Sequence, residues 1–267
     1  MRRRATSVLL AIALGGSVLQ AGDPDPLELL RRSIQAEEAN RARAASYLYT
    51  EDITRTAVVG EQVVESSSQR YEVIYLAGEP YFRLVGRDGK PLTPEEEEQE
   101  RRRMELVAAD RRAGRGQFTS PAERPRISVV YRILPESHEI RYLGTATMGG
   151  CQTWVLEAIP KKRSGRGGLN EMETRGLRVK LWIDQETLLR VRQDAEAVRN
   201  VGRLERGATL SYRYAPQADG IWLVRQIIFR TPDGKSKGLE RYRVTDQSYS
   251  SYHKFQAESV LTPDTPK

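Results

Sequence analysis

Segments rich in Tyr, Ile, Thr and Val recur along most of the chain, and short turn-forming stretches separate them. This pattern predicts β-strands, because β-branched and aromatic residues favour extended backbone whereas Gly, Pro and Asp favour turns. Most connections are short, which predicts antiparallel neighbours, with hairpin turns at Asp219-Gly220 and Asp233-Gly234-Lys235. The expected strands cover residues 46–58, 62–76, 80–87, 127–134, 137–145, 151–160, 177–184, 188–196, 207–215, 220–231 and 237–246.

Two helices are predicted by the same N-terminal signal, a capping residue followed by proline and then by glutamate at the third position. The signal occurs at Asp25-Pro26-Leu27-Glu28 and at Thr93-Pro94-Glu95-Glu96. Leu27, Leu30 and Ile34 lie on one face of the first helix, so that face must pack on something. The second helix has only a thin apolar stripe, so we expect it to lie largely solvated over a surface.

The fold class expected from these elements is mainly β (α+β). We expect an open, half-closed antiparallel β-barrel of about ten or eleven strands, covered by one or two helices. Residues 127–134 and 221–229 are apolar on both faces and therefore need cover on both faces. A lid helix and a ligand would supply that cover, and the alternative is a second sheet packed as in a sandwich.

The N-terminus has the layout of a secretory signal peptide over residues 1–21. Arg2, Arg3 and Arg4 precede a short apolar stretch, and small residues up to Ala21 form a cleavage region. No lipid-accepting Cys follows Ala21, and no later apolar run is long enough to span a bilayer. We therefore expect an exported protein, cleaved near Ala21, without a transmembrane segment in the mature chain. Residues 258–267 are expected to form a flexible tail, and the Gly-rich stretch 161–176 a mobile loop.

Charge and cysteine content narrow the possible partners. Removing residues 1–21 removes three arginines and no acid, which lowers the formal net charge from +7 to +4. The remaining basic residues are scattered among acids, which argues against a nucleic-acid partner. Cys151 is the only cysteine, so no internal disulfide forms, and we expect it to be a small buried hydrophobe.

Catalytic motifs are missing from the sequence after residue 21. His138 and His253 are the only histidines, which makes a zinc site implausible. No Gly-x-Ser-x-Gly elbow occurs, and Phe229 stands where a P-loop ending at Gly234-Lys235-Ser236 would need glycine. We therefore predict a non-catalytic protein with no cofactor and no metal. A hydrolase using Asp or Glu stays the alternative because carboxylates are abundant, although no pair among the 36 acids stands out as a site with a raised pKa.

The C-terminal half resembles the family of outer-membrane lipoprotein-sorting (LolA/LolB-like) proteins, which includes RseB-like periplasmic sensor domains. The resemblance rests on strand and turn residues, namely Tyr142-Leu143-Gly144, residues 154–161, Val179-Lys180-Leu181-Trp182-Ile183-Asp184 and Thr187-Leu188-Leu189-Arg190. It implies a periplasmic, lipid-binding domain over residues 22–257, built as an open barrel with an apolar cavity for acyl chains. It implies no catalytic residues. Without a lipid-attachment Cys, the chain resembles the soluble carrier, although the basic loop 161–176 departs from a strict carrier.

The resemblance leads to a function and a set of cavity residues. We expect a periplasmic carrier or binding protein for lipid or lipoprotein acyl chains; the alternative is an envelope-stress sensor or protein-interaction domain on the same fold, with envelope proteins as partners. Strand alternation puts Leu181 and Ile183 on the face opposite Trp182, so only one of these sets can face a cavity. Plain core packing is the alternative role for each cavity candidate: Tyr75, Tyr81, Phe82, Trp154, Trp182, Trp222 and Ile228.

Overall fold

The computed structural model describes residues 23–77, 79–115, 127–161, 176–200 and 204–255. The predicted signal peptide, the predicted tail and most of the predicted loop 161–176 lie outside these residues. The mainly β class is confirmed, because eleven strands within the described residues form one open antiparallel sheet. The strands are β1 (Tyr47–Val59), β2 (Gln62–Leu76), β3 (Glu79–Arg87), β4 (Lys90–Pro91), β5 (His138–Met148), β6 (Cys151–Pro160), β7 (Leu177–Asp184), β8 (Arg190–Ala197), β9 (Thr209–Pro216), β10 (Trp222–Ser236) and β11 (Leu239–Lys254).

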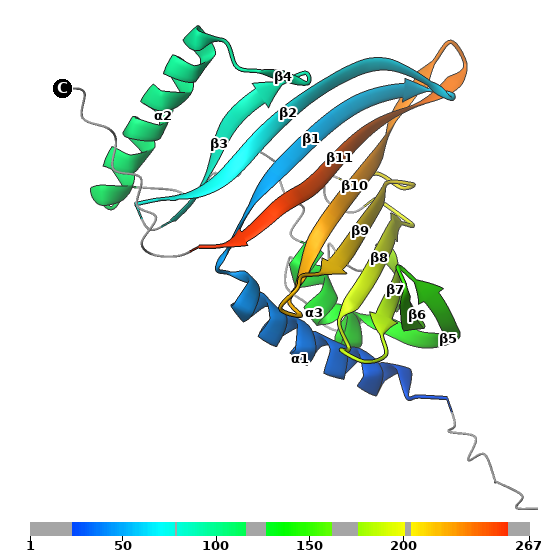
Figure 1. The fold of residues 1–267 in the computed structure, drawn as a ribbon. Helices are drawn as coiled ribbons and strands as arrows, with labels where there is room; N and C mark the ends of the chain where they lie inside the picture. The colour runs from blue at the N-terminus through cyan, green and yellow to red at the C-terminus, as the bar shows by residue number, and fades with distance from the viewer. Residues whose placement is uncertain (1–22, 78, 116–126, 162–175, 201–203, 256–267) are drawn as a thin grey trace, which may run out of the picture.

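The sheet runs in the order β4-β3-β2-β1-β11-β10-β9-β8-β7-β6-β5. The first and last strands in the sequence, β1 and β11, are neighbours in the middle of the sheet. They pair along almost the whole length of β1. The described part contains three helices, α1 (Pro26–Ala44), α2 (Pro94–Arg112) and α3 (Ile127–Ser137), one more than expected. Figure 1 shows α1 and α3 at one end of the sheet, near β5–β10, and α2 beside β3 and β4.

Helix α1 begins as the sequence predicts. The Asp25 side chain accepts hydrogen bonds from the amides of Leu27 (2.9 Å) and Glu28 (3.3 Å), which satisfies two amides that lack partners within the helix. The helix buries one face along its length, formed by Leu29, Leu30, Ser33 and Glu37. Two polar residues on that face indicate that α1 covers a surface with polar groups as well as an apolar core.

Residues 127–134 form part of helix α3, so the predicted strand there is wrong. A short apolar run rich in β-branched residues fits either a buried strand or a buried helix, and its periodicity alone does not distinguish them. In the structure, Tyr131 and Leu134 stand three positions apart on one helical face and are 2% and 0% exposed. They join the main core, between α1 and the inner faces of β6–β10.

The predicted hairpin turn at Asp233-Gly234-Lys235 is also wrong. Strand β10 continues through it as a bulge, with Gly234 at φ 77°, and pairs on to Ser236 opposite Leu239. The turn is Lys237-Gly238, whose φ values of 50° and 81° suit the two central positions of a tight hairpin. Strand β11 extends to Lys254, well beyond the predicted end at 246.

Helix α2 closes an open edge of the sheet. Strand β4 pairs with Gly86 and Arg87, and among the described residues the rest of β3 has no partner strand on that side. Glu100 accepts a hydrogen bond from the Leu84 amide (3.2 Å), and Arg111 donates to the carbonyls of Leu76, Glu79 and Pro80 (2.9 Å each). Two α2 side chains therefore satisfy backbone groups that an edge strand otherwise leaves exposed.

Candidate binding cleft

A cleft of about 550 Å³ lies between the C-terminal half of α1 and the sheet. This volume is in the range of small-ligand sites, about 300–1,000 Å³. Its walls come from α1, the start of β1, the end of β9, the start of β10 and the end of β11. The lining residues are Glu37, Asn40, Arg41, Ala44, Ala45, Tyr47, Tyr49, Arg190, Tyr212, Tyr214, Trp222, Leu223, Val224, Ile227, Gln247, Tyr249 and Tyr252.

The cleft exists because the sheet splits between β10 and β11. Their ladder runs from Ser236 opposite Leu239 to Gln226 opposite Ser248 and stops there. Beyond that point β10 pairs only with β9, and β11 pairs only with β1. The Tyr252 hydroxyl crosses the split and donates a hydrogen bond to the Val224 carbonyl. The two halves of the sheet diverge beneath α1 and leave the space that the cleft occupies.

Tyrosines dominate the cleft wall. Six of the twelve tyrosines in the chain line it. The Tyr49 ring lies 5.5 Å from the Tyr249 ring and 5.4 Å from the Tyr252 ring, and Tyr47 is 6.3 Å from Tyr252. Tilted and edge-on ring pairs at these distances stabilise one another. With Trp222, Leu223, Val224 and Ile227, these rings make a wall that is mainly apolar but carries hydroxyl groups.

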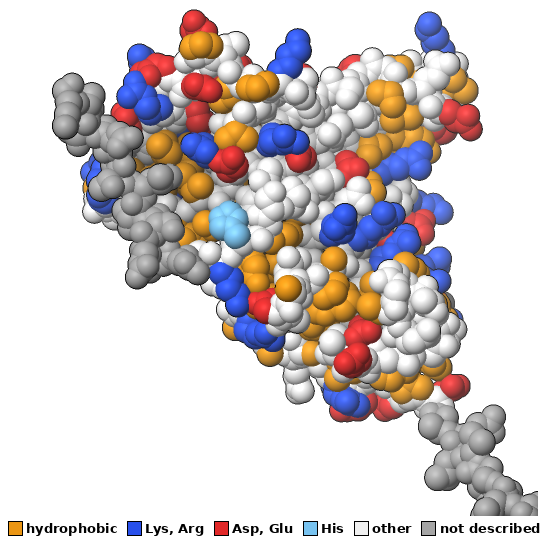
Figure 2. Space-filling view, viewed as in Figure 1, with side chains coloured by type: hydrophobic (Ala, Val, Ile, Leu, Met, Phe, Trp, Pro, Cys, Tyr) orange, Lys and Arg blue, Asp and Glu red, His pale blue; other side chains and the backbone are white. Residues whose placement is uncertain are grey.

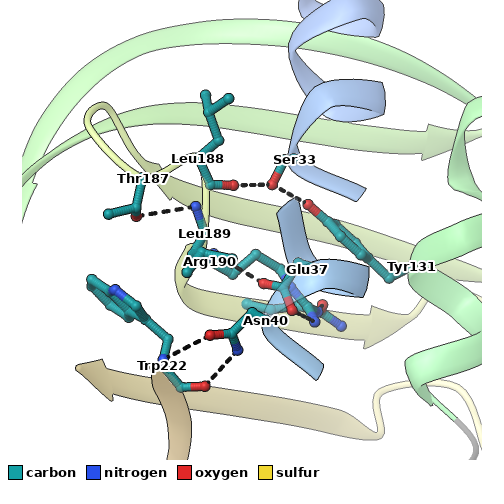
Figure 3. Close-up of polar contacts among 10 residues, drawn as sticks. Ser33, Glu37, Asn40, Tyr131, Thr187, Leu188, Leu189, Arg190 and Trp222 are labelled. Atoms are coloured by element: carbon teal, nitrogen blue, oxygen red, sulfur yellow. Dashed lines mark hydrogen bonds and ion pairs between the residues drawn. The ribbon is translucent and has the colours of Figure 1, made fainter. Parts of the chain in front are cut away.

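A buried ion pair forms the inner end of the cleft. Glu37 on α1 faces Arg190 at the start of β8, and both side chains are nearly inaccessible, 11% and 5% exposed. Arg190 donates from Nε to Oε1 at 3.0 Å and from a terminal nitrogen to Oε2 at 3.1 Å, while its own backbone amide donates to Oε1 at 3.0 Å. This fork geometry holds α1 against β8 (Figure 3).

Aromatic rings and an amide complete the surroundings of Arg190. Its guanidinium lies 3.9 Å from the centre of the Tyr131 ring and 5.0 Å from that of Tyr214, and it also donates to Gln193. Burial alone would raise the pKa of the Glu37 carboxyl, but the charge and hydrogen bonds of Arg190 outweigh burial and lower it. Both groups therefore stay charged, and neither is poised to exchange a proton near neutral pH.

Further polar contacts fix α1 over the sheet (Figure 3). The Asn40 side chain accepts from the Trp222 amide (2.8 Å) and donates to the Trp222 carbonyl (2.7 Å). The Tyr131 hydroxyl donates to Ser33 Oγ, which donates to the Leu188 carbonyl, each at 2.6 Å. These bonds end on backbone groups or neutral side chains, so they position the helix rather than create a reactive group.

The turn between β9 and β10 is tied across the mouth of the cleft. One oxygen of Asp219 in this turn accepts from the Tyr47 hydroxyl (2.8 Å) and from Lys254 (2.7 Å). Arg43 on α1 donates to the Asp219 carbonyl at 3.0 Å. The hydrogen bonds from Lys254 and Tyr47 lower the pKa of Asp219 to about 2. We call Asp219, Tyr47 and Lys254 the mouth clasp.

Of the predicted cavity residues, Trp222 alone lines this cleft. Trp154 is half-buried against the main core, and Ile228 is half-buried on β10. Tyr81 donates its hydroxyl to Glu100 of α2 at 2.7 Å, and Tyr75 donates to the Ala45 carbonyl at 2.9 Å.

The two other predicted cavity residues do not line the cleft, although Trp182 packs in the same buried cluster as Trp222. Phe82 packs in a second core cluster on β1–β3 with Ile53 and Val73. Trp182 lies beneath Lys180 and Arg192, whose charges are 5.1 and 5.0 Å from its rings. Leu181 and Ile183, on the opposite face, are fully buried in the main core, as strand alternation predicts.

The cleft tyrosines are the candidate-site residues that the sequence-based prediction missed. A signal for them was present, because Tyr47 and Tyr49 form a Tyr-x-Tyr pair and so do Tyr212 and Tyr214. Residues two apart on a strand share a face. The two pairs lie on β1 and β9, the strands that flank β11 and β10. They therefore mark an aromatic surface around the split.

Possible metal ligands and the described histidine His138 were located in the part of the chain that the structure describes. No group of three or more His, Cys, Asp or Glu side chains gathers there as a metal site would require. His138 is buried, with Nδ1 2.7 Å from Ser137 Oγ and Nε2 2.8 Å from the Leu177 carbonyl, and burial lowers its pKa. None of the described helices combines the length and apolarity that crossing a bilayer requires.

Comparison with known proteins yields structural matches only. No protein-family model and no curated protein sequence matches the chain. An outer membrane lipoprotein-sorting protein domain from Vibrio parahaemolyticus matches with 13% identity and a TM-score of 0.38, over 88% of this chain and 95% of that one. A LolA superfamily protein from Nitrosomonas europaea matches with 13% identity and a TM-score of 0.36, over 87% and 97%.

A third match is to the MucA/MucB complex of Pseudomonas aeruginosa. It has 9% identity and a TM-score of 0.27, over 88% of this chain and 100% of that one. The first two matches carry the name of the class that the sequence resemblance indicated. At these identities the likeness concerns the fold alone.

Proposed function

We propose that this protein binds the acyl chain of a lipid or lipoprotein in the cleft under α1, as a non-catalytic periplasmic carrier or binding protein. The observation that carries the proposal is an aromatic and aliphatic cleft that opens where the sheet splits. Burying apolar surface contributes about 25 cal/mol per Å², so a single chain seated against these rings gains several kcal/mol. The ion pair at the inner end is internally neutral and adds no catalytic group.

The position of Trp222 in the wall supplies a direct test. The chain has three tryptophans, and Trp154 and Trp182 do not line the cleft. A W154F/W182F variant therefore reports from Trp222 alone. We expect 12-bromododecanoic acid to quench its emission saturably, because a bromine atom quenches an indole that it contacts.

The matched control is a W182F/W222F variant, in which the only indole is Trp154, on β6 and outside the buried cluster of Trp222. Its emission should be unaffected over the same concentrations. Native mass spectrometry of the unsubstituted protein, with and without lipid extraction, then shows whether one acyl chain is bound per protein. A protein that stays empty when offered the probe, with Trp222 unquenched, contradicts the proposal.

A protein-interaction domain is the second candidate, and one observation favours it. Val63, Val64 and Leu239 are 62%, 51% and 54% exposed. They lie near the hairpin ends of β1–β2 and β10–β11, where a Cβ on Gly60 would meet Leu239 at 3.5 Å. Exposed aliphatic groups gathered in this way suit a contact with another protein. This patch lies at the far end of β1 from the cleft, so the two functions are compatible.

A further inference from the structure

A second cavity, of about 520 Å³, lies on the outer face of the sheet. Its walls include Arg213, Gln226 and Ser248, which pair directly across β9, β10 and β11. Directly paired residues share a face, and their sequence neighbours point to the other face. The neighbours Tyr212, Ile227 and Gln247 line the cleft under α1, so the two cavities lie back to back.

A bulge in β10 brings two arginines together in this outer cavity. Val224 pairs with Tyr214, whereas Gln226 already pairs with Arg213, which leaves Arg225 as the extra residue. A bulge of this kind re-aims the side chains around it. Arg225 consequently lines the outer cavity together with Arg213. In Figure 2, Lys and Arg side chains gather where Figure 1 draws β9 and β10.

Neither of these arginines is neutralised by the residues that the structure describes. Both are exposed, and no carboxylate among those residues forms an ion pair with Arg213 or Arg225. The acid of the cavity wall is Asp52, and it is held by Arg70 at 2.7 Å. The cavity thus presents two free guanidinium groups beside serine hydroxyls, a donor set suited to phosphate.

The outer cavity and the cleft share Leu223, Tyr249 and Tyr252 in their walls. These residues stand at the split, where no backbone ladder joins β10 and β11. The apolar cleft and the basic cavity therefore meet at the gap between two strands. An amphiphile has the same division into an apolar chain and a polar head.

We propose that Arg213 and Arg225 bind the phosphate head group of a lipid whose acyl chain lies in the cleft, with the lipid passing through the split between β10 and β11. This inference rests on the proposed function and names its ligand class, a phosphate-bearing single-chain or multi-chain lipid. The Tyr252–Val224 hydrogen bond crosses the path and must yield when the lipid enters.

The test compares the Kd values of two probes of equal chain length. Both are read from the Trp222 emission of the W154F/W182F protein. Dodecyl phosphate carries the head group, and monolauroylglycerol is its uncharged counterpart. Replacing both Arg213 and Arg225 with Gln should raise the Kd for dodecyl phosphate about tenfold or more, because the charge-assisted hydrogen bonds to the phosphate are lost. The Kd for monolauroylglycerol should change by less than about twofold, because this probe carries no phosphate. Arg41→Gln, in the cleft wall on the α1 side, tests the other placement of the head group. The matched control is Arg206→Gln, an exposed arginine that lines neither cavity.

Each other outcome overturns the inference in a distinguishable way. If Arg41→Gln produces the loss instead, the head group lies on the helix side. If both probes bind equally in every variant, or if inorganic phosphate binds as tightly as dodecyl phosphate, the outer cavity does not serve a lipid. If monolauroylglycerol binds and dodecyl phosphate does not, the inference fails while the proposed function stands. If neither probe binds the protein with intact arginines, the proposed function fails as well.

Discussion

At the residue scale, the Glu37–Arg190 pair shows how a buried charge is tolerated. Each ion gives up hydration, and a forked hydrogen-bond arrangement offsets the loss. We expect Glu37→Gln to lower the free energy of unfolding by about 3–5 kcal/mol, because it leaves a buried guanidinium without its counter-charge. A Glu37→Leu/Arg190→Met double variant should recover most of this loss. Urea unfolding of the three proteins measures it, and equal stability of the single variant and the parent would contradict the assignment.

The same pair gives a pH dependence whose sign is fixed. The folded-state pKa of Glu37 is lower than its ordinary value of 4.5. A group of this kind contributes stability above the unfolded pKa and loses it as the pH falls through the folded pKa. Urea unfolding should therefore show that the difference in free energy of unfolding between the parent protein and Glu37→Gln is constant at about pH 6–7. This difference should shrink below about pH 4.5.

Single residues also show where sequence reasoning about the site stopped. Trp222 was anticipated because a large aromatic in a two-sided apolar strand needs cover. Tyr249 and Tyr252 were not, because they follow the predicted end of their strand at residue 246. Arg190 formed part of the family resemblance, but its partner Glu37 lies 153 positions away. A pairing over that distance depends on how α1 crosses the sheet, which no local pattern encodes.

At the scale of elements, α2 acts as an edge cover more than as a core helix. Its Arg111 side chain is 2% exposed and bonds three carbonyls, whereas Arg112 is exposed. Arg111→Met should lower the free energy of unfolding by about 2 kcal/mol, since charged hydrogen bonds are lost. It should also promote self-association, because the edge of β3 is uncovered.

Arg112→Met is the matched control, with one charge removed from the same turn of the helix. Thermal unfolding together with sedimentation velocity distinguishes the variants. Similar behaviour of the two would show that α2 does not protect the edge.

Most elements were predictable because their signals are local. The caps at Asp25 and Thr93 fixed two helix starts, and β-branched content with short turns fixed most strands. The prediction of a strand over residues 127–134 was wrong, because the secondary structure of an apolar run of this length depends on what it packs against. Here Tyr131 and Leu134 pack against α1. The predicted turn at Asp233-Gly234 was wrong, because a tight hairpin needs two successive residues with positive φ. Lys237 and Gly238 provide them.

At the scale of the whole molecule, the mouth clasp joins the two halves of the split sheet. Asp219→Asn should weaken the contact with Lys254 while leaving global stability nearly unchanged, because exposed ion pairs contribute little. We expect faster amide hydrogen exchange in residues 217–223 and no change in the core strands. Asp233→Asn is the control, since Asp233 bonds Arg241 and Arg243 at the other end of β10. Unchanged exchange in residues 217–223 would refute the clasp.

The termination of the β10–β11 ladder at Gln226 also has a mechanical consequence. When two paired strands are pulled apart, every backbone hydrogen bond between them is lost, and a sheet resists this strongly. Here β10 and β11 are already separated on the far side of the Gln226–Ser248 pair. Moving these ends further apart therefore breaks contacts made by side chains and no backbone ladder. The ladder between Gln226 and Leu239 stays intact, so a wider gap beyond Gln226 requires no change in the register of the strands that the structure describes.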